Sequence, residues 1–558
     1  MQIPRCRLTS VLNVPRVLTL LMLVSALTAE VAEHQPRLGI PQDWTHSHVM
    51  FSRQVFSTHP SLANAEPRVL QQFLRRAQPY FSMTNSSVSR DQRDRPTIPL
   101  KRDWNVALGT GKVAFGMSPV KYSLDANAPP DCINDYAAFG LNVAGVTGGQ
   151  ANFVGLNNLY SGPGGLCGSG SPTVLFAYNT TTTAGGAVIT SPVLSLDGTK
   201  IAFVESATGA AVFHVLTWSS GPGNGTSPTN SADPGVGNSA SMTSLTYASI
   251  TNTRSSPWVD YNADVAYVGA DDGNLYKITG VFNGTPTLAG APWPITVSAN
   301  RRLTAPVLDQ VTRNIFLGDS RGILFSVNVD TPGSRASLDV GLPGALRAGI
   351  LDGPLVDSDN GTVFAVSSND GVGAVVVQAD ASSLAELQRG RIGAGSTTGT
   401  ALNIYDGAFN NNYFNDPNTG ALFLCGTGPA DTTPWRYFFR FTGRIMDASP
   451  SSSVQLLPST IARCSPISEF FNQNIGANGT DFFFWGLTTE CTGPGTPGCV
   501  MSRNNFDVVT TANEAGGTSA IIIDNNSTAG QASSIYFTDQ GDPKGAVKLT
   551  QNGLQEGR

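Results

Sequence analysis

The stretch SSPWVDYNADVAYVGADDGNLYKITG, from Ser255 to Gly280, decides the fold. It begins with a small residue and a proline. Three short apolar segments follow, separated by an acidic turn and a turn that contains glycine. Short apolar segments bounded by such turns are typical of antiparallel strands. The stretch therefore predicts a small sheet whose consecutive strands lie side by side.

The same pattern recurs along the chain, in TAPVLDQVTRNIFLGDSRGILFSVNV (Thr304–Val329) and in DGPLVDSDNGTVFAVSSNDGVGAVVVQAD (Asp352–Asp380). Pro257, Pro306 and Pro354 mark the same point of the pattern, at intervals of 49 and 48 residues. Weaker copies begin at Pro119, Pro192, Ala408, Pro466 and Ala520. A period near fifty residues, filled with strands and tight turns, is typical of the blades of a β-propeller.

The repeats predict an all-β fold, namely a single β-propeller of eight four-stranded blades, with seven blades as the alternative. One blade cannot cover both of its faces, so neighbouring blades bury them and closure of the ring removes most exposed edges. The composition agrees, because 60 glycines, 35 prolines and a charged fraction of 13% disfavour both a helical bundle and a disordered chain. Lys101–Gly109, KRDWNVALG, is expected to supply a strand that completes the last blade.

Two segments resemble a known family. AYVGADDGNLYKITG (Ala266–Gly280) and IFLGDSRGILFSVNV (Ile315–Val329) resemble the PQQ-type repeat of quinoprotein-like β-propellers. SLDGTKIAF (Ser195–Phe203) is similar to the repeat of TolB-type propellers. The resemblance covers roughly residues 118–550 and implies a propeller fold. It leaves the activity open, because such repeats occur in enzymes and in scaffolds.

The N-terminus has the features of a secretory signal peptide. Three arginines precede an apolar run from Val17 to Ala29, which is too short to span a bilayer. Small residues near Ala26 and Ala29 leave the cleavage site ambiguous, and an uncleaved signal anchor is the alternative reading. The mature protein is expected to be secreted or periplasmic. The expected divisions are a signal peptide over 1–29, an N-terminal extension over 30–100 and the propeller over 101–558.

Pro67–Gln78, within the extension, predicts a helix. Its apolar residues share one helical face, and Pro67 suits the first turn. These residues are Val69, Leu70, Phe73, Leu74 and Ala77. The helix is expected to pack on the propeller, a partner-binding arm being the alternative. The polar segment Asn85–Arg102 is expected to be a linker.

Six cysteines remain when Cys6 leaves with the signal peptide, and in an oxidising compartment they are expected to form disulfides. They are Cys132, Cys167, Cys425, Cys464, Cys491 and Cys499. Pairing each with its nearest neighbour in sequence is one of several connectivities. The firmest pair is Cys491–Cys499, which closes the loop CTGPGTPGC.

The charge is unevenly distributed. Residues 1–102 hold 13 Lys and Arg against 6 Asp and Glu, whereas residues 103–558 hold 21 against 34. A body that is this acidic has no general attraction for nucleic acid. We therefore expect no nucleic-acid partner. No stretch after the signal is long and apolar enough to predict a membrane span, and a monomer is expected.

Ser320 lies in GDSRG, which matches the Gly-x-Ser-x-Gly pattern of serine hydrolases. That motif requires a strand-to-helix elbow. Other repeats carry ADDG and SNDG at the same place, so Ser320 is interpreted as a residue of a turn between two strands. His214, the one histidine of the repeat region, lies in the strand-like AVFHVLTW.

Five residues are candidate metal ligands. His46 and His48 would point to the same side of an extended segment, where two imidazoles could share a metal. Asp260, Asp309 and Asp357 recur at one point of the repeat, where an acid closes a turn through hydrogen bonds to the backbone. If these acids converged on the channel, they could instead bind a cation such as calcium.

The first functional hypothesis is a non-catalytic propeller that recognises protein or carbohydrate through its loop face. The alternatives are a quinone- or metal-dependent oxidoreductase of the quinoprotein type and, more weakly supported, a glycan hydrolase or lyase with paired carboxylates. The resemblance implies that a quinoprotein enzyme would need PQQ between an aromatic ring and a disulfide, a calcium site and a catalytic aspartate. The chain has no adjacent cysteine pair, so no catalytic residue is assigned.

Overall fold

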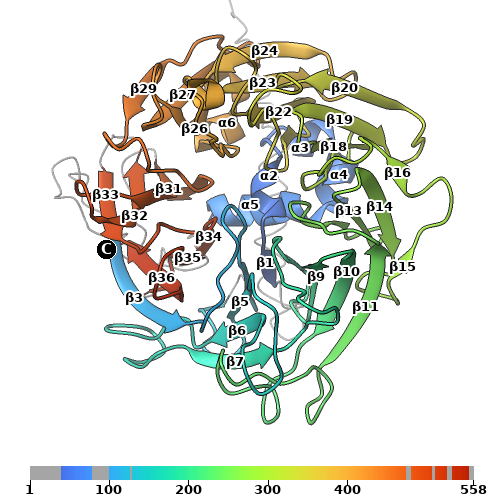
Figure 1. Cartoon of the computed structure of the whole chain (residues 1–558), viewed down its shortest axis with the longest axis vertical. Coiled ribbons are helices and arrows are strands. Elements are labelled where there is room, and N and C mark those ends of the chain that lie inside the picture. Colours follow the sequence, from blue (N-terminus) through green and yellow to red (C-terminus); the bar gives the residue numbers. More distant parts are fainter. Residues whose placement is uncertain are drawn as a thin grey trace, which may run out of the picture. The chain divides into compact units, whose positions relative to one another are not determined.

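The computed structural model describes residues 39–77, 100–125, 128–472, 479–504, 509–524 and 531–551. In this part of the chain, the strands form eight sheets arranged as a ring (Figure 1). The predicted eight-bladed β-propeller is therefore confirmed. The expected signal peptide and most of the polar linker lie outside the described residues.

The first four blades follow one another along the chain. Blade 1 contains β4 (Val120–Ser123), β5 (Tyr136–Gly140), β6 (Phe153–Asn157) and β7 (Thr173–Tyr178). Blade 2 contains β8 (Val193–Leu194), β9 (Lys200–Ala207), β10 (Ala210–Thr217) and β11 (Ser241–Ala248). Blade 3 contains β12 (Trp258–Asp260), β13 (Val265–Gly269), β14 (Asn274–Thr279), β15 (Thr287–Leu288) and β16 (Ile295–Thr296). Blade 4 contains β17 (Val307–Leu308), β18 (Asn314–Gly318), β19 (Ile323–Asn328) and β20 (Arg335–Asp339).

The remaining blades complete the ring. Blade 5 contains β21 (Leu355–Asp357), β22 (Thr362–Ser367), β23 (Val375–Asp380) and β24 (Glu386–Arg391). Blade 6 contains β25 (Ala408–Phe409), β26 (Ala421–Thr427), β27 (Pro434–Thr442), β28 (Ile445–Met446) and β29 (Ser452–Gln455), with helix α6 (Asn411–Asn415) between β25 and β26. Blade 7 contains β30 (Ser468–Asn472), β31 (Thr480–Thr489), β32 (Pro497–Asn504) and β33 (Val509–Asn513). Blade 8 contains β34 (Ile522–Asp524), β35 (Ser534–Thr538), β36 (Gly545–Gln551) and β3 (Leu100–Ala107). Short 3₁₀ helices cover Gly395–Thr398 and Pro417–Thr419.

The repeat prolines lie at the starts of the blades, as the sequence predicts. In each of the first five blades, the strand nearest the channel begins next to its proline, as Val120 follows Pro119 and Val307 follows Pro306. Proline has no N–H, so it is tolerated at the first residue of a strand. Gly322, in a turn between second and third strands, has a φ of +92°, and a Cβ there would lie 2.2 Å from the carbonyl oxygen of Ala348. Glycine is therefore required where this turn packs against the next blade.

The ring closes between blade 8 and blade 1. Strand β3 pairs antiparallel with β36, with Leu100 opposite Gln551 and Ala107 opposite Gly545. The segment that was predicted to complete the last blade thus does so. This pairing joins an N-terminal strand to the C-terminal blade, so blade 8 has no missing strand.

A buried charge network lies at this closure. The ammonium nitrogen of Lys121 lies 2.9 Å from a carboxylate oxygen of Asp524, and both side chains are fully buried. The Lys121 nitrogen also lies 3.9 Å from Asp135, whose carboxylate accepts a 2.6 Å hydrogen bond from the Tyr160 hydroxyl. Burial raises the pKa of Asp135, against the opposing effect of Lys121. Blades 1 and 8 are therefore joined by charges that water does not reach.

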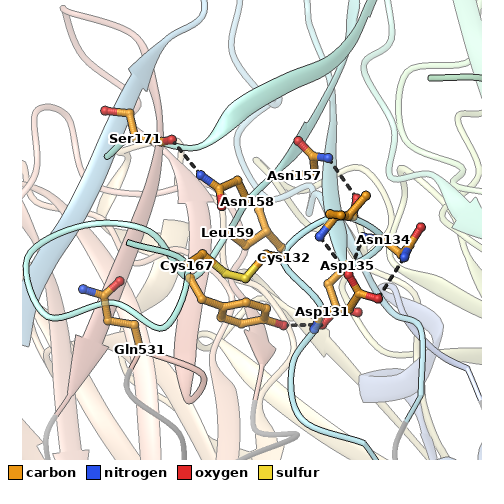
Figure 2. The surroundings of a disulfide bond; sticks show 12 residues. Asp131, Cys132, Asn134, Asp135, Asn157, Asn158, Leu159, Cys167, Ser171 and Gln531 are labelled. Carbon is orange, nitrogen blue, oxygen red and sulfur yellow. Dashed lines mark hydrogen bonds between the residues drawn. A yellow bond between two sulfur atoms is a disulfide. The ribbon is translucent and has the colours of Figure 1, made fainter. Parts of the chain in front are cut away.

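The three disulfides follow the nearest-neighbour pairing, which confirms that prediction. Cys132–Cys167 links the loop after β4 to the loop after β6 (Figure 2). Beside it, the carboxylate of Asp131 accepts hydrogen bonds from Asn134, and the Asn157 amide donates to the Ile133 carbonyl. Cys425–Cys464 links blade 6 to the loop that leads into blade 7, and Cys491–Cys499 lies within blade 7.

The N-terminal segment, residues 39–77, contains two short strands and four helices. They are β1 (Ile40–Gln42), α2 (Thr45–His48), β2 (Val49–Met50), α3 (Val55–Thr58), α4 (Pro60–Ala65) and α5 (Pro67–Ala77). Helix α5 matches the helix that the sequence predicts, and the other elements were not predicted. None of the helices that the structure describes is both long and apolar enough to cross a membrane.

Candidate functional site

The N-terminal segment enters the central channel and pairs with the strands that line it. Strand β1 pairs antiparallel with β4 of blade 1, and β2 pairs parallel with β21 of blade 5. Figure 1 shows β1, α2 and α5 inside the ring. The side chain of Asp43 accepts a hydrogen bond from the backbone N–H of Leu194, in the first strand of blade 2. Arg68 of α5 donates a hydrogen bond to the Val259 carbonyl in the first strand of blade 3, which confirms the predicted packing of the helix on the propeller.

The segment also contacts the turns between the first and second strands of blades 3 to 6. The Asn262 amide donates to the carbonyl of Ala65, and the Gln310 amide lies 3.5 Å from Glu66. The backbone N–H of Arg53 donates to the carbonyl of Phe414. We call the side that carries these turns the plugged face. The opposite side, which carries the turns between second and third strands and the loops that enter each blade, is the open face.

Arg68 is a fully buried polar anchor of the segment. Its guanidinium donates to the Val259 carbonyl at 3.0 Å and to the Thr45 hydroxyl at 2.8 Å, and it pairs with Glu66 at 3.1 Å. It also lies over the ring of Trp258, 4.3 Å from the centroid. Burial opposes its charge, yet the Glu66 carboxylate raises the pKa of Arg68 above its ordinary value. The anchor therefore stays charged inside the protein.

His46 and His48 lie on one helical turn, α2, so the expected extended arrangement is wrong. Residues two apart on a helix point in nearly opposite directions, and the two rings contact different groups. His46 lies 3.1 Å from the carboxylate of Asp43 and bonds Gln71 through its other nitrogen. His48 lies 3.2 Å from the carboxylate of Asp352. Burial opposes protonation of His48, but Asp352 raises the pKa of this histidine.

Asp260, Asp309 and Asp357 each accept hydrogen bonds from the backbone of their own turn. The N–H donors are those of Asn262, Val311 and Asn360, at 3.1, 3.0 and 3.0 Å. All three acids therefore act as turn-closing residues on the plugged face. Within the described ranges, no group of three or more histidine, cysteine or acidic side chains is placed to hold a metal ion.

Asp357 is the member of this set with a strongly shifted pKa. Burial raises the pKa of Asp357 to about 6, even though the Tyr413 hydroxyl donates to its carboxylate at 2.6 Å. The unfolded value is about 4. Between these values the folded state holds more protons than the unfolded state, so the free energy of unfolding falls as pH rises through this window.

Replacement of Asp357 by asparagine is expected to remove this dependence. The unfolding free energy of the wild type minus that of Asp357→Asn should be about 2–3 kcal/mol lower at pH 7 than at pH 4. Chemical denaturation at both pH values measures the difference. Asp330→Asn, at a mostly exposed carboxylate, is the matched control and should show a difference near zero. Equal pH profiles for the wild type and Asp357→Asn would contradict the prediction.

Ser320 lies in the turn between β18 and β19, as predicted, and not at a strand-to-helix elbow. A different serine, which no sequence pattern indicates, lies beside a histidine. The hydroxyl of Ser244 lies 2.9 Å from Nδ1 of His214, whose Nε2 lies 2.8 Å from the Glu205 carboxylate. This order of groups is that of a hydrolase triad.

The Ser244 triad is better explained as a structural hydrogen-bond network of blade 2, in which His214 and Glu205 are buried and Ser244 is exposed on the outermost strand. Ser244 lies within the paired strand β11, and acyl transfer also requires N–H donors aimed at the substrate oxygen. Glu205 already accepts hydrogen bonds from the backbone N–H groups of Thr182 and Thr183. We therefore assign His214 a structural role, in which it bridges two strands of the blade.

A cavity of about 40 Å³ lies in the channel between α2 and the open face. Trp44, Ser47 and His48 line one end of it. Residues that precede the first strands of the blades also line it, among them Ser118, Ser191 and Ser256. These serines are linked, since the N–H of Ser118 donates to the Ser191 hydroxyl oxygen and that of Ser191 to Ser256.

Asp406 is an unusual lining residue of this cavity. Its side chain is buried, and one carboxylate oxygen has no hydrogen-bond partner among the described residues. Burial, and then the negative charge of Asp352, raises the pKa of Asp406 well above its ordinary value. The cavity therefore has an unpartnered carboxylate oxygen in its wall, and it suits water or a small polar group.

The residues present do not fit a PQQ cofactor. The quinoprotein site implied by the repeat resemblance requires a disulfide between adjacent cysteines, and none of the three disulfides joins adjacent cysteines. Trp44 and His48 of the N-terminal segment also stand in the channel. No step through a quinone is therefore derived.

No protein-family model and no curated protein matches the chain. Among solved structures, the chain is similar to BamB from Moraxella catarrhalis, with 12% identity, a TM-score of 0.39, and coverage of 73% of this chain and 95% of that one. It is similar to the Dos1 propeller, with 11% identity, a TM-score of 0.48 and coverage of 81% and 95%. It is also similar to Sqt1 from Chaetomium thermophilum, with 12% identity, a TM-score of 0.48 and coverage of 81% and 98%. At these identities the likeness concerns the fold alone.

Proposed function

We propose that this protein is a non-catalytic, exported propeller that binds a partner protein through its open face. The observation that carries the proposal is the difference between the two faces. The N-terminal segment covers turns of blades 3 to 6 on the plugged face. The loops of the open face lie on the opposite side of the ring from these contacts. Ligand recognition on rigid scaffolds is usually carried by such loops.

Other observations support export and a binding role. The apolar run Val17–Ala29 is typical of a signal peptide, and three disulfides are typical of an oxidising compartment. Two repeats resemble the PQQ-type repeat, which occurs in scaffolds as well as in enzymes. Of the two catalytic arrangements considered above, the quinone site has no disulfide between adjacent cysteines in the described part of the chain, and the Ser244 hydroxyl lies within the paired strand β11.

Site-specific photo-crosslinking in the natural host tests the proposal. A photoreactive residue at Val372, which is 73% exposed on the open face, is expected to capture a partner. The matched control is the same residue at Val311, 36% exposed on the plugged face, which should capture none. The partner is then purified, and its affinity for the full chain is measured. Capture only from Val311, or a captured protein with no measurable affinity, would overturn the proposal.

A further inference from the structure

Three arginines from consecutive blades gather at the open mouth of the channel. Arg254 lies in the loop that enters blade 3, Arg302 in the loop that enters blade 4 and Arg347 in the loop that enters blade 5. Arg254 lines the channel cavity, and Arg302 and Arg347 are exposed. We call these three residues the arginine cluster. They lie on a protein whose formal net charge is −6, so the cluster opposes the overall charge.

No member of the arginine cluster forms an ion pair with another residue in the part of the chain that the structure describes. Burial, and then the charges of Arg302 and Arg347, lower the pKa of Arg254 to about 10. Asp271 acts in the opposite direction, but its carboxylate accepts hydrogen bonds from Thr253. Arg254 is therefore still positive at neutral pH, and an anion bound among the three guanidinium groups would relieve their mutual repulsion.

Exposed aliphatic side chains lie next to the arginine cluster. Leu342, Leu346 and Val372 are 49%, 48% and 73% exposed. The loop that carries Leu342, Leu346 and Arg347 is fixed to the Val372 turn through Asn369, whose carbonyl accepts from the Leu342 N–H and whose amide donates to the Leu346 carbonyl. Aliphatic groups beside arginine are typical of the core of a protein interface.

We propose that the arginine cluster and these aliphatic residues bind a segment of the partner protein that carries both carboxylates and aliphatic side chains. This inference rests on the proposed function and names the chemistry of the partner. The carboxylates neutralise the cluster, and the aliphatic side chains of the segment cover Leu342, Leu346 and Val372. A free phosphate or a sulfated glycan could use the arginines but not the aliphatic residues, so the observations favour a peptide.

Binding of a labelled peptide of alternating glutamate and leucine tests the inference by fluorescence anisotropy. The double variant Arg302→Glu/Arg347→Glu of the full chain is expected to bind it at least about tenfold more weakly. Arg335→Glu/Arg440→Glu is the matched control, because it makes the same charge change at exposed arginines of β20 and β27. The control should retain the wild-type affinity. Equal weakening in both double variants, or no binding to the wild type at millimolar peptide, overturns the inference.

The aliphatic part of the surface is tested separately. Leu342→Ser/Leu346→Ser should weaken binding of the glutamate–leucine peptide several-fold and leave that of polyglutamate unchanged. Heparin is the competing probe. If heparin binds through the same arginines more tightly than the peptide does, and the leucine variant has no effect, the ligand is a sulfated glycan and the inference is wrong.

The photo-crosslinking experiment separates this inference from the proposed function. If Arg302→Glu/Arg347→Glu still captures the partner from Val372 with unchanged affinity, the inference fails and the proposed function stands. If the wild type captures no partner from Val372, the proposed function fails.

Discussion

Replacement of Lys121 by methionine is expected to lower the free energy of unfolding by about 3–5 kcal/mol. The Lys121 ammonium group is fully buried, 2.9 Å from Asp524 and 3.9 Å from Asp135, at the closure between blades 8 and 1. Methionine keeps the apolar length of the side chain but removes the charge. The two buried carboxylates then lack the positive charge that lay beside them. Burial of this unbalanced negative charge destabilises the folded state by more than the lost attraction alone.

Chemical denaturation of the full chain measures this effect. Lys544→Met is the matched control, because Lys544 is paired with the highly exposed Asp542 at 3.7 Å, and it should change stability by less than about 1 kcal/mol. The double variant Lys121→Met/Asp524→Asn should regain part of the loss, because it removes one of the uncompensated charges. A loss for Lys121→Met no larger than that for Lys544→Met would show that the network does not stabilise the closure.

The second large effect is expected at Arg68, the anchor of the N-terminal segment. In Arg68→Met, the Glu66 carboxylate, which is 3% exposed, loses its partner, and the Val259 carbonyl loses a donor. The free energy that holds the segment in the channel should fall by about 3–5 kcal/mol. Hydrogen exchange should therefore show at least about 100-fold less protection of the amides of α5.

Arg53→Met is the matched control for this experiment. Arg53 lies in the same segment with an exposed side chain, and its backbone N–H makes the contact with Phe414. The protection of α5 should be unchanged in Arg53→Met. If α5 exchanges at the same rate in both variants, Arg68 does not anchor the segment. Amides in the outer strands of blade 4 report separately whether the ring itself stays folded.

Much of the fold could be predicted from local patterns. Pro257, Pro306 and Pro354 mark blade starts because a residue without an N–H suits the first position of a strand. The strand Leu100–Ala107 could be assigned to the last blade because a closed ring leaves few exposed edges. The helix at Pro67–Ala77 also depends on residues close together in the sequence, and the three disulfides join cysteines no more than 39 residues apart.

The candidate site could not be predicted in the same way, because it depends on contacts between distant residues. The pattern HSH suggested an extended pair of ligands, but contacts with Gln71 and Asp352 fix His46 and His48 on a helical turn. Arg68 and Lys121 look like ordinary surface cations in the sequence. Only the arrangement of blades shows that both are buried. The arginine cluster likewise combines three loops that are about fifty residues apart.

The position of the N-terminal segment also constrains the order of folding. Synthesis proceeds from the N-terminus, so residues 39–77 are made before every strand that they contact. Strand β2 cannot pair until blade 5 has been made, and Arg76 cannot reach Glu469 until blade 7 has begun. Strand β3 cannot pair until β36, which is made later still, has been synthesised. Contacts between such distant parts of a chain form slowly, because a long loop must close first. The earliest part of the propeller to be synthesised is thus among the last to complete its contacts.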